Sequence, residues 1–536
     1  MKLNEDGMKN RAEWKAAGYA LPEFDRETIK KETAKHPFWI HFGAGNLFRA
    51  SVANVVQKLL NQGIIDRGVI AAEGYDCEVI EKLYRPHDNY MIHVTVLPDG
   101  RMEKTVIGSI TESLALDAEN EADFDRLKEI FRKESLQIVT VTITEKGYSF
   151  VNGKGELLRE VEEDIKNGPG KPASLIGKIT ALLYERFLNG AKPIAMVSMD
   201  NFPKNGEEFR TAVATIAERW TKDQKAEGDF FCYVNDESRV SFPWTMIDKI
   251  APRPGNFVME VLKKDDVEEP ESVMTAKNTR AALFVNTEAF EYLIIEDNFP
   301  NGRPALAQGD LVFASRETVE RAEKMKACTC FDPLQTALAI FGCLLGYKKI
   351  SEEMKDEAIR KLVEEIGYKE GLLAAANPGI IEPKEFLSNA LSVRLPNSFL
   401  PDTPQRIATD TSKKLAIRFG ETIRWYMTSE RFNVKDLRGI PMVFAGWLRY
   451  LTGVDDRGNV FALSPDELLS SICPYVMKVK LGGDVDTESL RPLLSDARIF
   501  GVDLYEAHLA EKVCEYFVEM CKGKGAVREV LERYYL

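Results

Sequence analysis

Polar side chains of types that can take part in catalysis lie at the start of an apolar run in residues 324–342, KMKACTCFDPLQTALAIFG. Lys326 can give or take a proton, and the side chains of Asp332 and Gln335 can bind or orient a polar group. The same spacing predicts a helix start, with Asp332 as N-cap, Pro333 at the first helical position and Gln335 reaching back to the cap. Spacing alone favours the structural interpretation. The other motifs must decide whether this helix start also faces a substrate.

A glycine turn, Gly43-Ala44-Gly45, lies between an apolar run and a segment with helical spacing. Glycines at such a turn let a pyrophosphate approach the backbone, and the helix N-terminus favours its negative charge. The third glycine of the dinucleotide fingerprint is missing, so the motif alone is weak. Arg49 follows four residues after Gly45 and either pairs with a phosphate or is a surface arginine of the helix.

Glu73 ends a second apolar run, GVIAAEG, at residues 68–74. A carboxylate in this position accepts hydrogen bonds from ribose hydroxyls and repels a 2′-phosphate, which favours NAD over NADP. Its distance from Gly45 exceeds the usual spacing of about 20 residues, which weakens the prediction. The residues that we expect to bind the cofactor are Gly43, Gly45, Asn46, Arg49, Glu73, Thr144 and Glu145.

Two further strand ends are polar: TITEKGY at 142–148 and SMDNFPKNG at 198–206. Each can be a simple turn, because Lys-Gly and Asn-Gly are common turn dipeptides. In a doubly wound sheet the same ends surround the ligand. There Asn201 can donate a hydrogen bond to a carbonyl or alkoxide oxygen, and Glu145 can relay a proton.

Arg406 and Lys414 lie eight residues apart in PDTPQRIATDTSKKLAIRFGE, residues 401–421. In one continuous helix this spacing of a little over two turns places them roughly on one face. Helix charges are usually solvated. In an acidic protein, however, such a pair can form the cationic cluster that a carboxylate substrate needs.

The elements that position these residues alternate between strands and helices in the first half of the chain. Apolar runs at 136–148 and 193–201 end in polar residues as parallel strands do, and residues 173–190 have the spacing of an amphipathic helix between them. This alternation predicts an α/β fold with a mostly parallel Rossmann-type sheet, whose ligand lies beyond the carboxyl ends of the strands.

The periodicity becomes helical in the second half. We therefore predict an NAD-binding domain with an N-terminal extension over residues 1–280 and a mostly α-helical substrate domain over residues 281–536. A length of 536 residues suits two large domains.

Composition excludes several classes. The chain has 71 basic and 84 acidic residues, a net charge of −13, which argues against nucleic-acid binding. No run approaches the about 20 apolar residues of a membrane span and the polar start has no signal-peptide core, so we expect a cytoplasmic protein. Eight dispersed cysteines predict buried free thiols, and five histidines without a zinc motif predict no metal site.

Several motifs occur together and in order, and they resemble those of the polyol-specific long-chain dehydrogenase/reductase (mannitol dehydrogenase) family. They are HFGAGNLFR, TITEKGY, SMDN, FPWTMIDKIAPRP, IEDNFPNGRP, the 324–342 segment and PDTPQRIATDTSKKLAIRFGE. The resemblance covers nearly the whole chain. Among the branches, the chain looks most like the fructuronate reductases, also called D-mannonate oxidoreductases.

The resemblance implies metal-independent hydride transfer between NAD(H) and a keto-hexuronate, here D-fructuronate reduced to D-mannonate. It implies a lysine general acid/base, Lys326, and an asparagine that holds the oxyanion, Asn201. Arg406 and Lys414 are implied to contact the substrate, together with Asn201 and Lys326. The implied partner is a small sugar acid or polyol, bound by a monomer or small homo-oligomer.

The chain departs from this branch at the opening segment. The branch pattern Asn-Pro-Leu-His-Thr is here Asp332-Pro333-Leu334-Gln335-Thr336, so an aspartate replaces the second oxyanion asparagine and a glutamine replaces the histidine. An ionised aspartate repels an oxyanion unless it is protonated or paired with a cation. The alternative is therefore a catalytically impaired or engineered relative, or one retuned to tagaturonate, mannitol or fructose, or another keto sugar.

Overall fold

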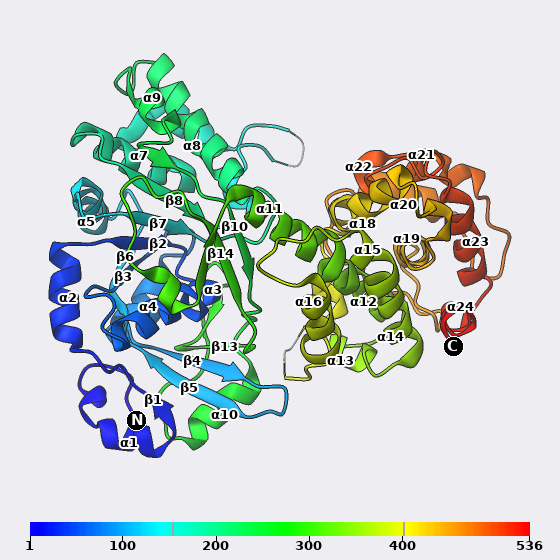
Figure 1. Cartoon of the computed structure of the whole chain (residues 1–536), viewed down its shortest axis with the longest axis horizontal. Coiled ribbons are helices and arrows are strands. Elements are labelled where there is room, and N and C mark those ends of the chain that lie inside the picture. Colours follow the sequence, from blue (N-terminus) through cyan, green and yellow to red (C-terminus); the bar gives the residue numbers. More distant parts are fainter. Residues whose placement is uncertain (153–154, 400–401) are drawn as a thin grey trace. The chain divides into compact units, whose positions relative to one another are not determined.

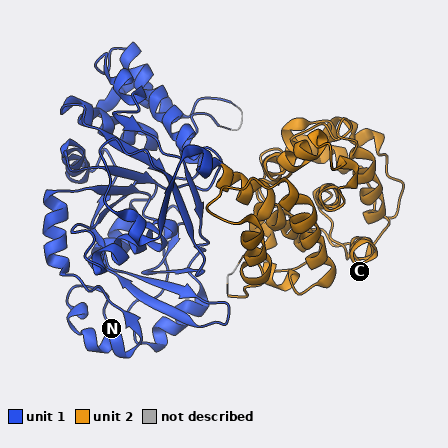
Figure 2. Cartoon of the chain, in the orientation of Figure 1, with its two compact units in different colours: residues 1–320 blue, residues 321–536 orange. Residues whose placement is uncertain are grey.

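The computed structural model describes residues 1–152, 155–399 and 402–536, and it forms two compact units, Met1–Glu320 and Arg321–Leu536 (Figure 2). The predicted boundary after residue 280 falls earlier than this division. The reason is strand pairing, because β13 (Phe284–Thr287) pairs with β4 (Met91–Val96) inside the first unit. Hydrogen bonds between strands of distant sequence therefore keep residues 281–320 in the first unit.

The first unit is built on a six-stranded sheet whose strands all run parallel (Figure 1). Its spatial order is β6 (Ile110–Ala115), β3 (Val69–Glu73), β2 (Trp39–Phe42), β7 (Ile138–Val141), β8 (Ile194–Ser198) and β9 (Val240–Ser241). The order corresponds to the 3-2-1-4-5-6 arrangement of a doubly wound fold, which reverses between β2 and β7. The predicted Rossmann-type α/β fold is confirmed.

The core of this sheet forms where helices cover its face. Apolar side chains of β2, β3, β7 and β8 pack with those of α5 (Glu121–Arg132), α7 (Leu175–Leu188), α8 (Asn205–Lys222) and α9 (Phe230–Asn235). The predicted helix at 173–190 is α7, which starts where the Ser174 side chain accepts a hydrogen bond from the Gly177 amide. The other helices of this unit are α1 (Arg11–Ala16), α2 (Arg26–Lys35), α3 (Asn46–Ala50), α4 (Val52–Asn61), α6 (Arg159–Asn167) and α10 (Asn256–Lys264).

Three smaller sheets complete the first unit. The four-stranded sheet runs β1 (Tyr19–Ala20), β5 (Met102–Ile107), β4 and β13. The three-stranded sheet runs β10 (Thr245–Asp248), β14 (Tyr292–Glu296) and β15 (Leu311–Ala314), and β11 (Val273–Met274) pairs with β12 (Arg280–Ala281). Several of these strands follow residue 240, which is where sequence periodicity underestimated the strand content.

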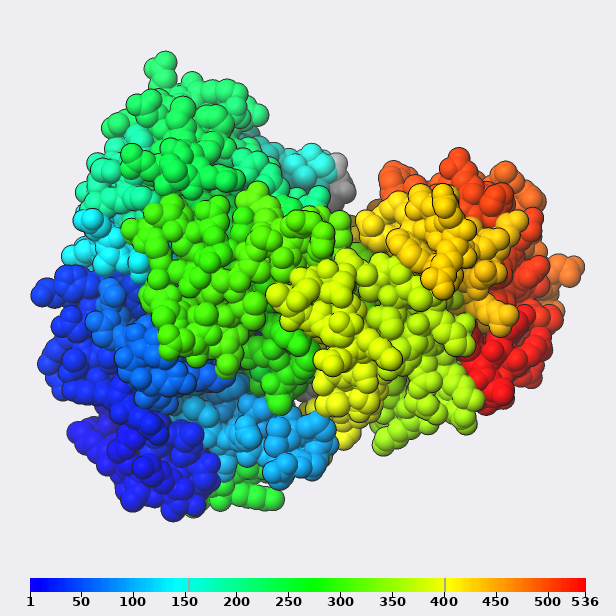
Figure 3. All heavy atoms as spheres, in the orientation of Figure 1, coloured from blue at the N-terminus to red at the C-terminus, as the bar shows by residue number. Residues whose placement is uncertain are grey.

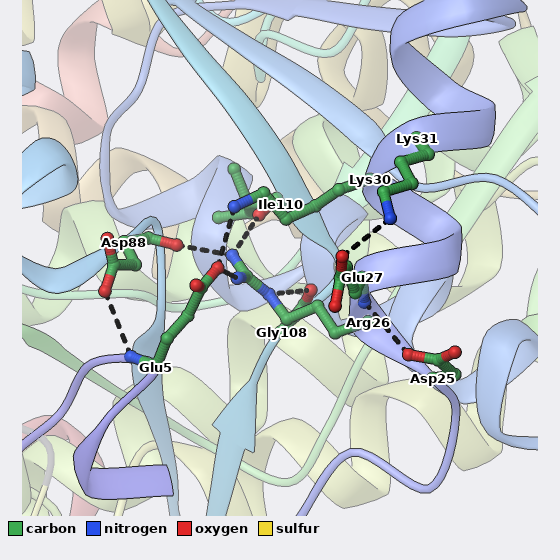
Figure 4. A network of polar contacts seen from close by, with 9 residues as sticks. All are labelled: Glu5, Asp25, Arg26, Glu27, Lys30, Lys31, Asp88, Gly108 and Ile110. Atoms are coloured by element: carbon green, nitrogen blue, oxygen red, sulfur yellow. Dashed lines mark hydrogen bonds and ion pairs between the residues drawn. The ribbon is translucent and has the colours of Figure 1, made fainter.

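The N-terminal extension is fastened by the buried Arg26 side chain. Its Nε donates to the Gly108 carbonyl at 3.0 Å, its Nη2 to the Ile110 carbonyl at 3.1 Å, and its Nη1 to Glu5 at 3.0 Å (Figure 4). Its guanidinium also lies 4.0 Å above the ring of Tyr90. In the space-filling view the dark blue N-terminal residues gather at one end of this unit (Figure 3).

The second unit is helical among its described residues, as the sequence predicts. Its helices are α12 (Asp332–Leu345), α13 (Ile350–Glu353), α14 (Glu357–Glu364), α15 (Leu372–Ala374), α16 (Pro383–Asn389), α17 (Pro404–Ile407), α18 (Thr411–Thr428), α19 (Gly439–Leu451), α20 (Leu469–Val476), α21 (Arg491–Leu494), α22 (Ala497–Phe500), α23 (Ala510–Met520) and α24 (Ala526–Tyr535). Buried α19 packs against α12 and α23.

One helix is long and apolar enough to cross a membrane by length and composition alone. It spans Arg316–Leu345 and joins α11 (Arg316–Lys324), a π-helical turn (Met325–Cys330) and α12. In its most apolar 18-residue window, 83% of the residues are buried within the protein. Core helices of soluble proteins pass the same test, so this helix is weak evidence for a membrane span.

Candidate active site

The glycine turn after β2 is fixed by close backbone approach. Gly43 has a φ of +107°, and a Cβ on it would lie 2.2 Å from the carbonyl oxygen of Thr142, at the end of neighbouring β7. Its amide donates to the carbonyl of Ala72 on β3 at 2.7 Å. A Cβ on Gly45, by contrast, would meet no atom within 4 Å. Gly43 therefore joins three strand ends, whereas Gly45 borders open space in which a ligand can lie.

A buried carboxylate braces this turn from the next strand. Glu73 accepts a hydrogen bond from the Ala44 amide at 2.8 Å through Oε2, and from the amides of Tyr75 at 2.8 Å and Asp76 at 3.1 Å through Oε1. Burial raises the pKa of Glu73, and these three N–H donors act in the opposite direction by stabilising its anion. Glu73, which is predicted to bind ribose, therefore also fixes the shape of the glycine turn.

A cleft of about 680 Å³ opens at these strand ends, within the first unit. Its volume is that of a small-molecule site, and it lies where a doubly wound sheet binds its ligand. Its wall combines glycine backbone, hydroxyl groups, lysines and the Glu73 carboxylate: Gly43, Gly45, Glu73, Thr142, Thr144, Ser174, Lys146, Lys178 and Lys277. Open backbone at Gly45, an acceptor at Glu73 and several lysines together fit a dinucleotide with its ribose and phosphates.

Thr144 holds a strained conformation at the edge of this cleft. Its φ of 62° and ψ of 159° lie in a backbone region that residues other than glycine rarely adopt. Asp200 stabilises the conformation, because its carboxylate accepts hydrogen bonds from the amides of Ile143 at 3.0 Å and Thr144 at 2.9 Å and from the Tyr148 hydroxyl at 2.6 Å. Asn201, directly after this carboxylate, is exposed.

Three predicted cofactor residues do not line the cleft formed by the described residues. Arg49 is only 1% exposed and donates inward, to the carbonyl of Ala282 at 2.6 Å and to Asn46 Oδ1 at 2.7 Å. The Asn46 amide in turn donates to the Pro252 carbonyl at 2.8 Å. These two residues fasten the glycine turn instead of facing a phosphate. Glu145 is exposed in a short 3₁₀ turn.

Lys326 lies in the second unit and is 2% exposed. It belongs to the π-helical turn Met325–Cys330, in which backbone hydrogen bonds join residues five positions apart instead of the four of an α-helix. The Phe331 amide donates across this turn to the Lys326 carbonyl at 3.1 Å. π-Helical turns inside α-helices occur frequently at functional sites, which agrees with a functional role for Lys326.

The predicted cap at Asp332 is wrong. Phe331 is the N-cap residue of α12, Asp332 is already helical, and neither Asp332 nor Gln335 makes a capping hydrogen bond. The π-helical turn Met325–Cys330 runs up to Phe331, whose amide donates to the Lys326 carbonyl, so the chain enters α12 from a helical turn and not from a loop. The Asp332 side chain is therefore available for another partner.

That partner is Arg418, on α18. Its Nη2 lies 3.7 Å from Asp332 Oδ2, and its Nη1 donates to Thr336 Oγ1 at 2.6 Å and to the Asp332 carbonyl at 3.3 Å. The side chains of the ion pair are only 14% and 15% exposed, so their attraction is screened less than that of a surface pair. Gln335, one turn further along α12, is half-buried.

Arg406 and Lys414 do not share one helix. Arg406 belongs to α17, where it is 67% exposed and pairs with both carboxylate oxygens of Asp402 at 2.6 Å. Lys414 belongs to α18, because Asp410 adopts a left-handed conformation that ends the helical path between them. Burial, followed by the nearby charge of Arg418, lowers the pKa of Lys414 to about 8.

Sequence reasoning missed Arg418 and Asp200. Arg418 follows Lys414 by four residues on one helix, a spacing that places the two cations on the same face, and this signal was present in the sequence. Asp200 directly precedes Asn201 at a strand end. Among the described residues, no group of three or more His, Cys, Asp or Glu side chains is arranged to hold a metal. All eight cysteines are free thiols, as predicted, but only four of them are buried as expected.

A doubly wound parallel sheet with a glycine turn and a cleft at its switch point defines a Rossmann-type protein. Residues 38–308 match the mannitol dehydrogenase Rossmann domain, and residues 333–521 match the mannitol dehydrogenase C-terminal domain. The chain therefore belongs to the mannitol dehydrogenase family of oxidoreductases, as its motifs suggested.

Relatives and solved structures agree with this assignment. D-mannonate oxidoreductase of Thermotoga maritima is 50% identical over 535 residues, which are 99% of this chain and 98% of that protein. D-mannonate oxidoreductase of Escherichia coli is 28% identical over 82% of this chain and 84% of that protein. The structure of Pseudomonas fluorescens mannitol 2-dehydrogenase, a ternary complex with NAD and D-mannitol, shares the fold with a TM-score of 0.75, 24% identity, and coverage of 100% of this chain and 99% of that chain.

The same substitution is expected to destabilise the protein much more at Gly43 than at Gly45. Gly43→Ala is expected to lower the free energy of unfolding by about 2–4 kcal/mol, because its Cβ collides with the Thr142 carbonyl and the positive φ adds strain. Gly45→Ala, the matched control, is expected to change it by less than about 1 kcal/mol. Urea denaturation followed by tryptophan fluorescence measures both. Equal stability of the two variants would contradict the close approach at Gly43.

Proposed function

We propose that this protein is an NAD-dependent oxidoreductase that interconverts D-fructuronate and D-mannonate. The observation that carries the proposal is the full-length identity of 50% to a protein named D-mannonate oxidoreductase. The second unit supports a sugar-acid substrate, because Lys414 and Arg418 form a partly buried cationic pair in a chain whose net charge is −13.

Unit 1 supplies the features that favour NAD. The Gly43–Gly45 turn offers backbone to the pyrophosphate, and Gly45 leaves space for it. Glu73 lines the cleft with a carboxylate that suits ribose hydroxyls and disfavours a 2′-phosphate, which supports NAD over NADP. A relative of the same fold was solved with NAD, which agrees with this choice. Asp200 keeps the Thr144 edge of the cleft in its strained form.

Different side chains have different roles in the proposed hydride transfer. NADH, when bound, supplies the hydride for the C5 carbonyl carbon. In the reduction, Lys326 donates a proton to the carbonyl oxygen and is then reprotonated from solvent. In the reverse reaction, Lys326 accepts the proton of the substrate hydroxyl group and releases it to solvent. The Asn201 amide is the hydrogen-bond donor that the family resemblance assigns to the developing negative charge of the substrate.

Asp332 is compatible with this chemistry because its charge is offset. An isolated carboxylate in place of an amide would repel the developing oxyanion, and loss of one oxyanion donor typically lowers the rate about 10²–10³-fold. The Arg418 guanidinium neutralises Asp332 and leaves the oxyanion to Asn201. Gln335 retains hydrogen-bonding capacity without titrating, so its task is orientation of the substrate. We place the enzyme in the cytoplasm as a monomer or small homo-oligomer.

The direct test is turnover by the purified protein. We expect NADH oxidation, read from the loss of NADH absorbance, with D-fructuronate as substrate, and NAD reduction with D-mannonate. NADPH is expected to support at most about a tenth of the NADH rate, because Glu73 repels its 2′-phosphate. No turnover of D-fructuronate, D-tagaturonate or D-fructose with either cofactor across the neutral pH range would refute the proposal.

The substitutions at 332 and 335 discriminate an adapted site from an impaired one. In the variant Asp332→Asn with Gln335→His, kcat/KM for D-fructuronate is expected to fall about tenfold or more, because Arg418 loses its counter-charge in a poorly solvated place. The single Gln335→His variant is the control, since it leaves the ion pair in place. A large gain in kcat/KM would instead show that the natural chain is an impaired relative.

A further inference from the structure

We infer that Arg418 is the specificity-determining residue that binds the carboxylate of the sugar acid. The inference rests on the proposed function and identifies which part of the second unit recognises the acid group. Arg418 lies within the motif of residues 401–421, but the resemblance assigns no role to it.

The Arg418 guanidinium uses only some of its hydrogen-bond donors. Only Nη1 donates within the described residues, to Thr336 Oγ1 and to the Asp332 carbonyl. Nη2 faces the Asp332 carboxylate at 3.7 Å, which is an ion pair without a hydrogen bond, and Nε donates to no described residue. The Nε and Nη2 edge of a guanidinium is a fork that fits a carboxylate with two parallel hydrogen bonds. That edge is unused here in a side chain 14% exposed.

The Arg418 guanidinium is held in a fixed position by α12. The 2.6 Å bond to Thr336 ties Arg418 to the first turn of α12, six residues after the end of the π-helical turn that carries Lys326. Arg418 therefore presents its fork without first ordering a long, mobile side chain. Preorganisation of this kind lowers the entropic cost of binding an anion.

Charged side chains surround the Arg418 guanidinium. Lys414 lies one helical turn before Arg418 and its Nζ donates to the carbonyls of Ile407 and Thr409. Asp332 opposes the guanidinium, and Lys414, whose neighbouring charges are Arg418, Asp410, Asp332 and Arg406, adds a second cation close to the fork. A carboxylate ligand can pair with these two cations, whereas a neutral polyol cannot. Asp332 keeps the guanidinium in place.

Arg406 is less suited to this task. Its guanidinium already makes two hydrogen bonds to Asp402 and is two-thirds exposed, so a substrate carboxylate would have to displace a bidentate partner in a well-solvated place. The geometry therefore transfers acid recognition from the predicted residue, Arg406, to Arg418, with Lys414 in support.

The test compares an acid substrate with its neutral counterpart. Oxidation of D-mannonate and of D-mannitol by NAD is measured for the wild type, for Arg418→Gln and for Arg418→Lys. We expect Arg418→Gln to lower kcat/KM for D-mannonate about 100-fold, mainly through KM, and that for D-mannitol less than about threefold. Arg418→Lys is expected to fall between, because it keeps the charge and loses the fork.

The control variant is Arg424→Gln, which removes the same charge from the same helix at an exposed position that contacts Glu421 and Gly501. It is expected to keep the wild-type KM for D-mannonate. Equal losses on both substrates, or no loss on D-mannonate, in a variant that still binds NADH would overturn the role of Arg418 and leave the proposed function intact. A wild type that does not oxidise D-mannonate would refute the proposed function itself. Where D-mannitol turnover is too slow, the Kd values of D-mannonate and D-mannitol, both measured in the unreactive complex with NADH, give the same comparison.

Discussion

One buried carboxylate, that of Glu73, holds together the turn on which the cofactor cleft depends. It accepts hydrogen bonds from the amide of Ala44 in the glycine turn and from the amides of Tyr75 and Asp76 after its own strand. The ends of β2 and β3 are thereby joined at the point where a doubly wound sheet binds its ligand. Because Gly43 already touches β7, the position of the turn is fixed from both sides. The open space at Gly45 is a consequence of this arrangement.

The sequence predicted the fold where one local pattern determines the structure. Apolar runs that end in polar residues became β3, β7 and β8, and the segment 173–190 became α7. The domain boundary was predicted wrongly at residues 281–320. Short strands there, such as β13, are held by pairing with β4, about 190 residues earlier in the chain, and local periodicity does not show which distant strand a segment pairs with. The helix start at Asp332 failed for a related reason, since the π-helical turn before it removes the need for a cap.

The candidate site was predicted in part. Gly43, Gly45, Glu73 and Thr144 line the cleft, because strand-end residues of a parallel sheet must meet at one edge. Arg49 was assigned to phosphate binding by its distance along the chain, but its side chain turns inward to a carbonyl of a distant strand region. The role of Asp332 depends on Arg418, a residue 86 positions later, so no local pattern could reveal their pairing.

We propose that Glu73 both shapes the glycine turn and selects NAD over NADP. Titration of tryptophan fluorescence with NADH and NADPH tests it in Glu73→Gln, with Glu160→Gln, which removes a second carboxylate from the cleft wall, as control. The wild type and the control are expected to bind NADH at least about tenfold more tightly than NADPH. Glu73→Gln is expected to weaken NADH binding and to lose most of that preference, because one backbone hydrogen bond and the negative charge disappear together. An unchanged ratio of the two Kd values in this variant would contradict the account.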